Sequence, residues 1–212
     1  FIVGPTSRGT RHGVYDFLER YVGVIWLMPG DEWEDVPEQT NLTVPREDVR
    51  DEPDFTLRRS MNMGGSGDHA AIRSKWRLQN RTMSSQSIAL GHNLFSLFPV
   101  EKYGETHPEF YKDGQPPEPG QIARWQPCFS EEGTIAAAVS GIIDYFDRNP
   151  QADSYSLAVN DSGGYCEDDP SHPAYPGKIN SVGVTDMSDI YYAWVNEVVE
   201  QVLEVHPDKW FG

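Results

Sequence analysis

Apolar side chains recur at helical spacing in three parts of the chain. From Val14 to Tyr21 they stand at positions i, i+3, i+4 and i+7, which predicts an amphipathic helix after the polar turn at residues 4–10. A second helix is expected from about Glu131 to Phe146, with Ser130 suited to cap its N-terminus. A third is expected from about Asp189 to Val205. Each of these helices has one apolar face to bury.

Short apolar runs between the helices predict strands. Residues 24–28 are expected to form a short buried strand, and the alternation at residues 41–45 predicts an edge strand, where its proline is tolerated. Residues 154–159 show the clearest strand pattern, and residues 55–61 and 87–93 are two further candidates. In the second part of the chain, strand-like pieces alternate with helices, which is typical of parallel βα units.

A highly charged segment divides the chain in two. Residues 46–53 carry a charge at nearly every position and are expected to form a linker, so residues 1–52 would be the C-terminal part of a small α+β domain. The 160 residues that follow (53–212) are fewer than the roughly 250 of a complete (β/α)8 barrel. We therefore expect an α/β fold class, with the N-terminal half of a TIM barrel. Because Phe1 already lies in a strand-like run, we also expect a piece of a longer protein.

The composition argues against two classes of partner. Lys and Arg number 17 and Asp and Glu number 33, so the formal net charge is −16 and most of the surface would repel a nucleic-acid backbone. The mean hydropathy of −0.57 leaves no run long enough to cross a bilayer. We therefore expect no nucleic-acid partner and no membrane span. The two cysteines, Cys128 and Cys166, allow at most one internal disulfide and leave the redox compartment open.

Two polar residues directly follow the clearest strand. Asn160 and Asp161 stand where parallel α/β proteins bind ligands, outside the carboxyl ends of the strands. A carboxylate there can act as a general acid on a leaving oxygen, and the amide can hold a polar substrate group. The alternative is that residues 160–164 are only a turn rich in turn-forming residues. Spacing alone leaves both interpretations open.

Two other predicted strands end in or carry polar residues. His92 and Asn93 end the strand predicted at residues 87–93 and can contact a sugar hydroxyl, although a histidine satisfied within a loop network is the alternative. Arg58 would point from the strand predicted at residues 55–61 toward the same face, where its guanidinium can bind hydroxyls or a carboxylate. Pairing of Arg58 with the acidic surface is the alternative.

The remaining polar segments carry weaker signals. Residues 167–169 are acidic but lack the spacing of a calcium loop, so a solvated acidic loop is favoured. The sequence has no zinc-protease motif, phosphate-binding glycine loop or serine-hydrolase elbow, and we expect no metal and no cofactor. Cys128 has no evident base nearby and is expected to be a buried structural thiol. Residues 98–121 are expected to form a long irregular loop.

Two sets of motifs resemble known glycosidases. Residues 13–30, 34–37 and 52–55 resemble the junction between a small α/β domain and a TIM barrel in hexosaminidase-like and α-glucuronidase-like glycosidases. Further motifs are similar to those of the domain-of-unknown-function family 4838, which includes glycoside hydrolase family 163, endo-β-N-acetylglucosaminidases that act on complex N-glycans. These motifs are Gly-His-Asn at 91–93, the run 99–103, His-Pro-Glu-Phe at 107–110, Gln-Pro-Cys at 126–128 and Asn-Asp-Ser-Gly-Gly-Tyr-Cys-Glu at 160–167.

The resemblance implies a secreted or periplasmic bacterial glycoside hydrolase with a retaining mechanism. A substrate-assisted form, in which the acetamido group of the substrate is the nucleophile, stays open. Carried over by position, Asp161 would be the acid, Asn160 a substrate-orienting amide and Arg58 a strand-end arginine that holds a sugar. Further candidates for substrate binding are His92, Asn93, Tyr165 and Glu167. The chain differs at Asp168, where many members of the family have a second cysteine.

Three functions compete at this point. The first is a β-N-acetylglucosaminidase acting on glycoprotein or polysaccharide glycans, in which this chain is one part of the enzyme and needs the remainder of the parent chain for activity. The second is an α-glucuronidase-like glycosidase, which requires a cationic pocket for the uronate. The third is a non-catalytic carbohydrate-binding protein, whose aromatic residues stack on sugars and whose Asp161 is structural.

Overall fold

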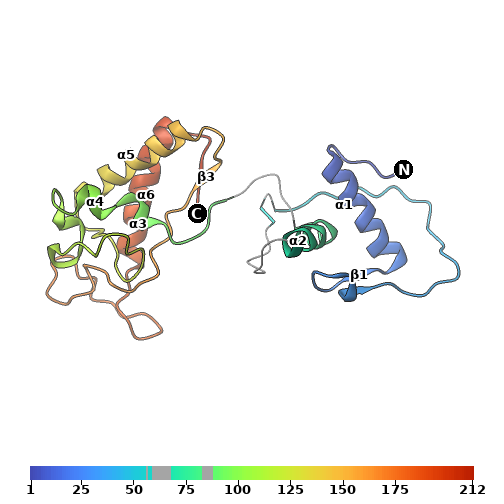
Figure 1. Cartoon of the computed structure of the whole chain (residues 1–212), viewed down its shortest axis with the longest axis horizontal. Coiled ribbons are helices and arrows are strands. Elements are labelled where there is room, and N and C mark those ends of the chain that lie inside the picture. Colours follow the sequence, from blue (N-terminus) through green and yellow to red (C-terminus); the bar gives the residue numbers. More distant parts are fainter. Residues whose placement is uncertain (56, 59–67, 83–87) are drawn as a thin grey trace. The chain divides into compact units, whose positions relative to one another are not determined.

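The computed structural model describes residues 1–55, 57–58, 68–82 and 88–212. It comprises two compact units, Phe1–Gln86 and Ser87–Gly212 (Figure 1). The units divide further along the chain than the boundary expected after residue 52, because the helix that follows this point packs against the first helix of the chain. The expected boundary itself, which concerns two domains of a larger enzyme, stays a prediction.

The first unit begins with the predicted amphipathic helix. Helix α1 spans Ser7–Phe17, and its last part continues as the π-helical turn η1, Leu18–Val22. The hydroxyl of Thr6 accepts a hydrogen bond from the Gly9 amide at 3.0 Å and caps the helix, which therefore begins within the segment 4–10 that was expected to be a turn. Gly23 ends the helix with a φ of 81°, a left-handed conformation that glycine adopts without strain.

A small hairpin follows this helix. Strand β1, Ile25–Trp26, pairs antiparallel with β2, Glu34–Asp35, across the short 3-10 helix η2, Asp31–Trp33. The strand predicted at residues 24–28 is therefore confirmed at Ile25–Trp26, whereas its expected burial is wrong, because Ile25, Leu27 and Met28 are exposed. The edge strand predicted at residues 41–45 is wrong, because this segment pairs with no neighbouring strand in the described part of the unit and its apolar side chains are exposed.

Helix α2, Asp68–Gln79, was not predicted and completes the first unit. The indole of Trp76 donates to the carbonyl of Trp26 at 3.1 Å, and the Gln79 amide donates to Glu34 at 2.9 Å, so polar contacts join the helix to the hairpin. Most of the strand predicted at residues 55–61, like residues 64–67, lies outside the described residues.

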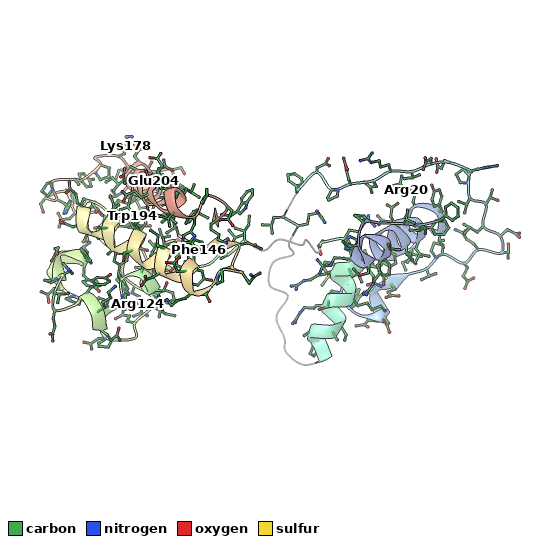
Figure 2. All side chains as sticks on the ribbon, turned by 90° about the horizontal axis from the view of Figure 1, so that it is seen from above. Arg20, Arg124, Phe146, Lys178, Trp194 and Glu204 are labelled. Carbon is green, nitrogen blue, oxygen red and sulfur yellow. A yellow bond between two sulfur atoms is a disulfide. The ribbon has the colours of Figure 1, made fainter. Side chains whose placement is uncertain are left out.

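The second unit is built around two long helices. Helix α5, Glu132–Arg148, and helix α6, Ser188–Val205, match the two helices predicted there within two residues at each end. They lie side by side in both views (Figure 1 and Figure 2) and pack against each other. Phe146 from α5 and Trp194 from α6, labelled in Figure 2, belong to the same buried aromatic core.

Short helices precede α5 where a long irregular loop was expected. They are α3 (Leu94–Leu97), α4 (Val100–Tyr103), η3 (Pro108–Phe110) and η4 (Lys112–Gly114). Tyr103 and Phe110 from these turns are buried against Phe98. The aromatic side chains therefore order this stretch, although residues 115–121 remain irregular as expected.

Two parallel strands are connected by α6. Strand β3, Ser154–Tyr155, pairs with β4, Trp210–Phe211, in parallel, and the pairing continues as Leu157 donates to the Gly212 carbonyl at 2.7 Å. This β3–α6–β4 unit has the parallel order predicted for the second part of the chain, and the strand predicted at residues 154–159 is confirmed at its first two residues. A partial TIM barrel stays a prediction.

Residues 88–93 run beside β3 but do not form the predicted strand. The amides of Ala89 and Gly91 donate to the hydroxyls of Ser154 and Ser156, at 2.7 Å and 3.3 Å. Because these serine side chains replace backbone carbonyls as acceptors, a regular ladder does not form. The residue numbers of the paired residues increase together, from Ala89 with Ser154 to Gly91 with Ser156, so the two segments run parallel. Within the described ranges, every helix is too short or too polar to cross a bilayer.

Candidate functional site

The carboxyl ends of two parallel segments meet in the second unit. The Asn93 amide donates to the carbonyl of Ala158 at 3.1 Å. The Phe95 amide donates to the Asn160 side-chain oxygen at 2.7 Å. His92 and Asn93 therefore lie next to the chain at Asn160, where parallel α/β proteins bind ligands. We define this meeting point as the candidate site.

Asn160 is buried, and the chain itself uses all of its polar atoms. Its side-chain amide donates to the Trp125 carbonyl at 3.0 Å, and its backbone amide donates to the Gln126 side-chain oxygen at 3.0 Å. With the bond from Phe95, these contacts tie three separate segments together. The structure thus gives Asn160 a positioning role. A direct contact of its amide with substrate stays a prediction.

Gln126 is the buried partner that completes this network. Its side-chain amide donates to the carbonyls of Asn160 and Ser162, both at 2.8 Å. Every unmet hydrogen bond in such a site would cost about 1–3 kcal/mol, so a fully bonded network rigidly fixes the backbone next to it. The residue that follows Asn160 is therefore held in a defined position.

Asp161 is exposed at the end of this rigid segment. Its carbonyl accepts a hydrogen bond from the Arg124 amide at 3.5 Å. Its carboxylate forms no hydrogen bond or ion pair with the described residues, and so is available to a group from outside. Of the residues predicted to act in catalysis, Asp161 is the accessible one.

Arg124 is a site residue that the sequence analysis missed. Its φ of 69° is left-handed, a conformation that costs a non-glycine residue about 1–3 kcal/mol and is concentrated at functional sites. Its guanidinium is exposed and has no polar partner in the part of the chain that the structure describes. Its only sequence signal is its place two residues before the Gln-Pro-Cys motif, and nothing local marks its backbone conformation.

His92 is oriented by a backbone carbonyl. Its Nδ1 lies 2.5 Å from the carbonyl oxygen of Val159. A carbonyl can only accept, so Nδ1 carries the hydrogen and Nε2 is left for another partner. The side chain of Asn93 is bound within the protein: its amide donates to the Ser156 carbonyl at 3.0 Å, and its Oδ1 accepts from the Ser96 hydroxyl at 2.8 Å. His92 is therefore better placed than Asn93 to contact a ligand.

A disulfide joins the two loops of the candidate site. Cys128 and Cys166 are both buried and bonded, with Cα atoms 5.2 Å apart. The backbone amide of Gln126 also donates to the Gly164 carbonyl at 3.2 Å and so links the same two segments. The expectation that Cys128 is buried is confirmed, whereas the expectation of a free thiol is wrong, because folding brings a cysteine 38 residues away into bonding distance.

Glu167 is fully buried and binds the start of α5. Its Oε1 accepts a hydrogen bond from the Ser130 amide at 2.7 Å, where the helix dipole favours a negative charge. Glu131, not Ser130, is the N-cap residue, so the predicted serine cap is wrong and the carboxylate supports the helix start instead. A substrate-binding role for Glu167 stays a prediction.

The other acidic residues of this loop have separate partners. Asp168 forms an ion pair with Lys112 at 2.5 Å, and Asp169 accepts from the Ser171 amide at 2.7 Å. The prediction of a solvated acidic loop therefore holds for Asp169 but is wrong for the buried Glu167. Across the described ranges, His, Cys, Asp and Glu side chains form no group of three or more that could hold a metal ion.

Tyr165 and Arg58 complete the set of predicted residues. Tyr165 is half-buried, its ring centre lies 6.1 Å from that of Phe129, and burial raises the pKa of its phenol. Arg58 belongs to the first unit, where it donates to the carbonyls of Phe55 at 2.7 Å and Arg81 at 3.1 Å. The candidate site therefore consists of second-unit residues.

One of three comparisons with known proteins found a match. A family model described as "Domain of unknown function (DUF4838)" matches residues 28–212. The comparison with curated proteins found no match, and neither did the comparison with solved structures. The match covers most of the first unit and the whole second unit, including every residue of the candidate site. The chain thus belongs to the DUF4838 family.

Proposed function

We propose that the protein is part of a glycoside hydrolase, a β-N-acetylglucosaminidase that acts on glycoprotein or polysaccharide glycans. The observation that carries the proposal is the exposed carboxylate of Asp161, which has no partner among the described residues and lies beyond the carboxyl end of the parallel segment that begins with β3. Ligands of parallel α/β proteins bind at this end. The resemblance of the surrounding motifs to hexosaminidase-like enzymes supports the same assignment.

Asp161 would donate a proton to the glycosidic oxygen as the bond to the leaving group breaks. A general acid of this kind works best when exclusion of water raises its pKa. Asp161 is exposed in this unit, so substrate and a further wall of the enzyme would have to cover it. The proposal therefore includes the earlier expectation that this chain needs the remainder of the parent chain for activity.

The nucleophile is best supplied by the substrate. The nearby carboxylates of the same loop are occupied, since Glu167 is buried at the start of α5 and Asp168 pairs with Lys112. A substrate acetamido group can attack the anomeric carbon without a second enzymic nucleophile. The arrangement therefore supports a retaining, substrate-assisted mechanism.

The disulfide supports an extracytoplasmic location. Disulfides persist in oxidising compartments and are rare where thiol reductants are abundant. The Cys128–Cys166 bond joins the two loops that carry Arg124 and Asp161. An oxidising compartment would preserve this bond and with it the geometry of the site. We therefore propose a secreted or periplasmic enzyme.

Arg124 favours a second candidate function. Its backbone amide contacts Asp161, and its exposed guanidinium, which has no polar partner among the described residues, is suited to bind the carboxylate of a uronic acid. This is the cationic group that an α-glucuronidase-like enzyme requires. Substrates with and without a uronate would separate the two candidates.

The test uses the full-length parent protein and a labelled biantennary N-glycopeptide. We expect Asp161→Asn to lower the rate of glycan release by about 10²–10⁴-fold, as is typical for loss of a general acid, and to leave glycan binding intact. Asp153→Asn is the matched control, because Asp153 is also exposed and precedes the same strand at its opposite end.

Three results would contradict the proposal. Equal release by the parent and by Asp161→Asn would remove Asp161 from catalysis. An equal loss of activity in Asp153→Asn would show a general effect of charge. Absence of release by every form, with tight glycan binding, would favour a carbohydrate-binding protein.

A further inference from the structure

The first unit contains an open cavity lined by both basic and acidic side chains. Its volume is about 2070 Å³, and it is lined in part by α1, by the end of α2 and by residues 44–53. The basic side chains in its wall include Arg8, Arg11, His12, Arg58, Lys75 and Arg81. The acidic side chains in the same wall are Asp16, Glu47, Asp48, Asp51 and Glu52, and Lys75 is already paired with Asp31 and Glu34.

Residues 44–53 also bring acidic side chains to the wall, and two of these have partners. Glu47 accepts a hydrogen bond from the Tyr21 hydroxyl, and Glu52 lies 3.5 Å from Arg50. The positive charge of the wall is therefore local to His12, where Arg8, Arg58 and Arg81 lie.

His12 lies where several of the basic groups converge. Burial lowers the pKa of its imidazole, and the nearby guanidinium groups of Arg58, Arg8 and Arg81 lower it further. Its Nε2 atom is buried and has no hydrogen-bond partner among the described residues. A buried polar atom of this kind costs free energy unless a ligand or a water molecule binds it.

Arg81 contributes a second unused donor. Its Nη2 atom lies 2.7 Å from a carboxylate oxygen of Glu19, whereas its Nη1 atom is buried without a hydrogen-bond partner among the described residues. Its carbonyl accepts from the Arg58 side chain at 3.1 Å, which holds the two arginines together. One guanidinium nitrogen is therefore fixed by an ion pair while the other remains to be satisfied.

We propose that this cavity is an anion-binding site, in which Arg81 Nη1 and His12 Nε2 donate hydrogen bonds to a carboxylate, sulfate or phosphate group. Arg8 and Arg58 add the positive charge that retains the anion. A guanidinium nitrogen and an imidazole N–H suit an oxyanion because charge-assisted hydrogen bonds are the stronger kind. The proposal is independent of the glycosidase chemistry proposed for the second unit.

The test follows the ring signals of His12 by NMR in the full chain. Sodium sulfate, sodium phosphate and sodium glucuronate are titrated separately at constant pH, with sodium chloride at equal ionic strength as the reference. We expect a saturable shift of the His12 signals with at least one oxyanion, and the three series identify which kind of group binds. A response no larger than that to chloride in all three series would overturn the proposal.

Variants then locate the binding site. Arg81→Gln should weaken binding by roughly tenfold or more, as expected for the loss of a charge-assisted hydrogen bond. Arg148→Gln is the matched control, because Arg148 is an exposed residue of α5 in the other unit and changes the net charge equally. Equal weakening by both substitutions would overturn the site.

A second variant tests the same site without removing the Arg81–Glu19 ion pair. Arg81 also pairs with Glu19, so its replacement can disturb the unit directly. His12→Phe removes the other proposed donor and should also weaken binding in isothermal titration calorimetry, with an unchanged circular dichroism spectrum. Full affinity in a folded His12→Phe protein would exclude the proposed geometry.

Discussion

The two units of the chain are held together by different interactions. In the second unit, sixteen buried apolar side chains form one continuous core. In the described residues of the first unit, Val24 and Trp26 are the buried hydrophobic residues. Because burial of apolar surface supplies most of the free energy of folding, we expect the second unit to be much the more stable.

The same difference separates the two sites. The candidate site of the second unit is fixed by a disulfide and by the buried Asn160–Gln126 network. The cavity of the first unit is bordered by partly exposed ion pairs such as Arg81–Glu19, and pairs of this kind contribute about 0–1 kcal/mol. The comparison shows a rigid site on a large core and a more adaptable site on a small one.

The largest expected effect is a loss of core packing in the second unit. Trp194 is 2% exposed, packs on Phe129 and donates to the Thr134 hydroxyl at 2.9 Å. Trp194→Ala should lower the free energy of unfolding by about 3–5 kcal/mol, measured by chemical denaturation. In Trp33→Ala, the matched control from the first unit, the replaced side chain is 48% exposed, and a comparable loss there would contradict the comparison.

Removal of the disulfide should have the next largest effect. The double substitution Cys128→Ser and Cys166→Ser opens a link across 38 residues and should destabilise the second unit by about 2–4 kcal/mol. Denaturation curves with and without a thiol reductant should differ in the parent and coincide in the variant. A reductant effect that persists in the variant would show that another cause is at work.

Loss of the buried network should follow. Gln126→Ala leaves the Asn160 amide and the carbonyls of Asn160 and Ser162 without their side-chain partner. We expect a loss of about 1–3 kcal/mol in unfolding free energy, again measured by chemical denaturation. Gln151→Ala, an exposed change before β3, is the control, and similar losses for both would argue against the network.

The smallest effect should be a pH dependence confined to the first unit. Burial and the charges of Arg58, Arg8 and Arg81 lower the pKa of His12 below its usual 6.5 in the folded state. The unfolded chain therefore binds a proton more readily, so stability is lost as the pH falls below about 6.5.

This pH effect can be measured by hydrogen exchange at amides of the first unit between pH 7.5 and 5.5. The protection of these amides should fall more steeply in the parent than in His12→Gln. Parallel pH profiles for the two proteins would show that His12 does not account for the change.

Local patterns predicted the long helices well and the strands less well. The apolar spacing of α5 and α6 is a property of neighbouring residues, and their bounds agree with the prediction within two residues. Residues 41–45 have a strand-like alternation, but a strand also needs a partner with free backbone groups, and none is present in the described part of that unit. Residues 88–91 bind serine hydroxyls for a similar reason, since Ser154 and Ser156 offer acceptors that a strand pattern does not reveal.

The candidate site was predicted in part for the same reason. The sequence placed Asp161 after a strand pattern, where parallel α/β proteins bind ligands, and the structure shows this residue exposed; its catalytic role stays a prediction. Arg124 was missed, since its left-handed backbone conformation and its hydrogen bond to Asp161 depend on how a distant loop folds. Glu167 looked like part of a solvated acidic loop until folding placed it at the start of α5.

The sequence by itself determined the amphipathic helices, the acidic surface and the polar residues that follow the strand at 154–159. The tertiary structure alone decided the Cys128–Cys166 bond, the buried role of Asn160 and the cationic cavity around His12. The physical reason is distance along the chain. Helical periodicity and charge are sums over neighbouring residues, whereas a disulfide, a buried hydrogen-bond network and a cluster of like charges join residues that only the fold brings together.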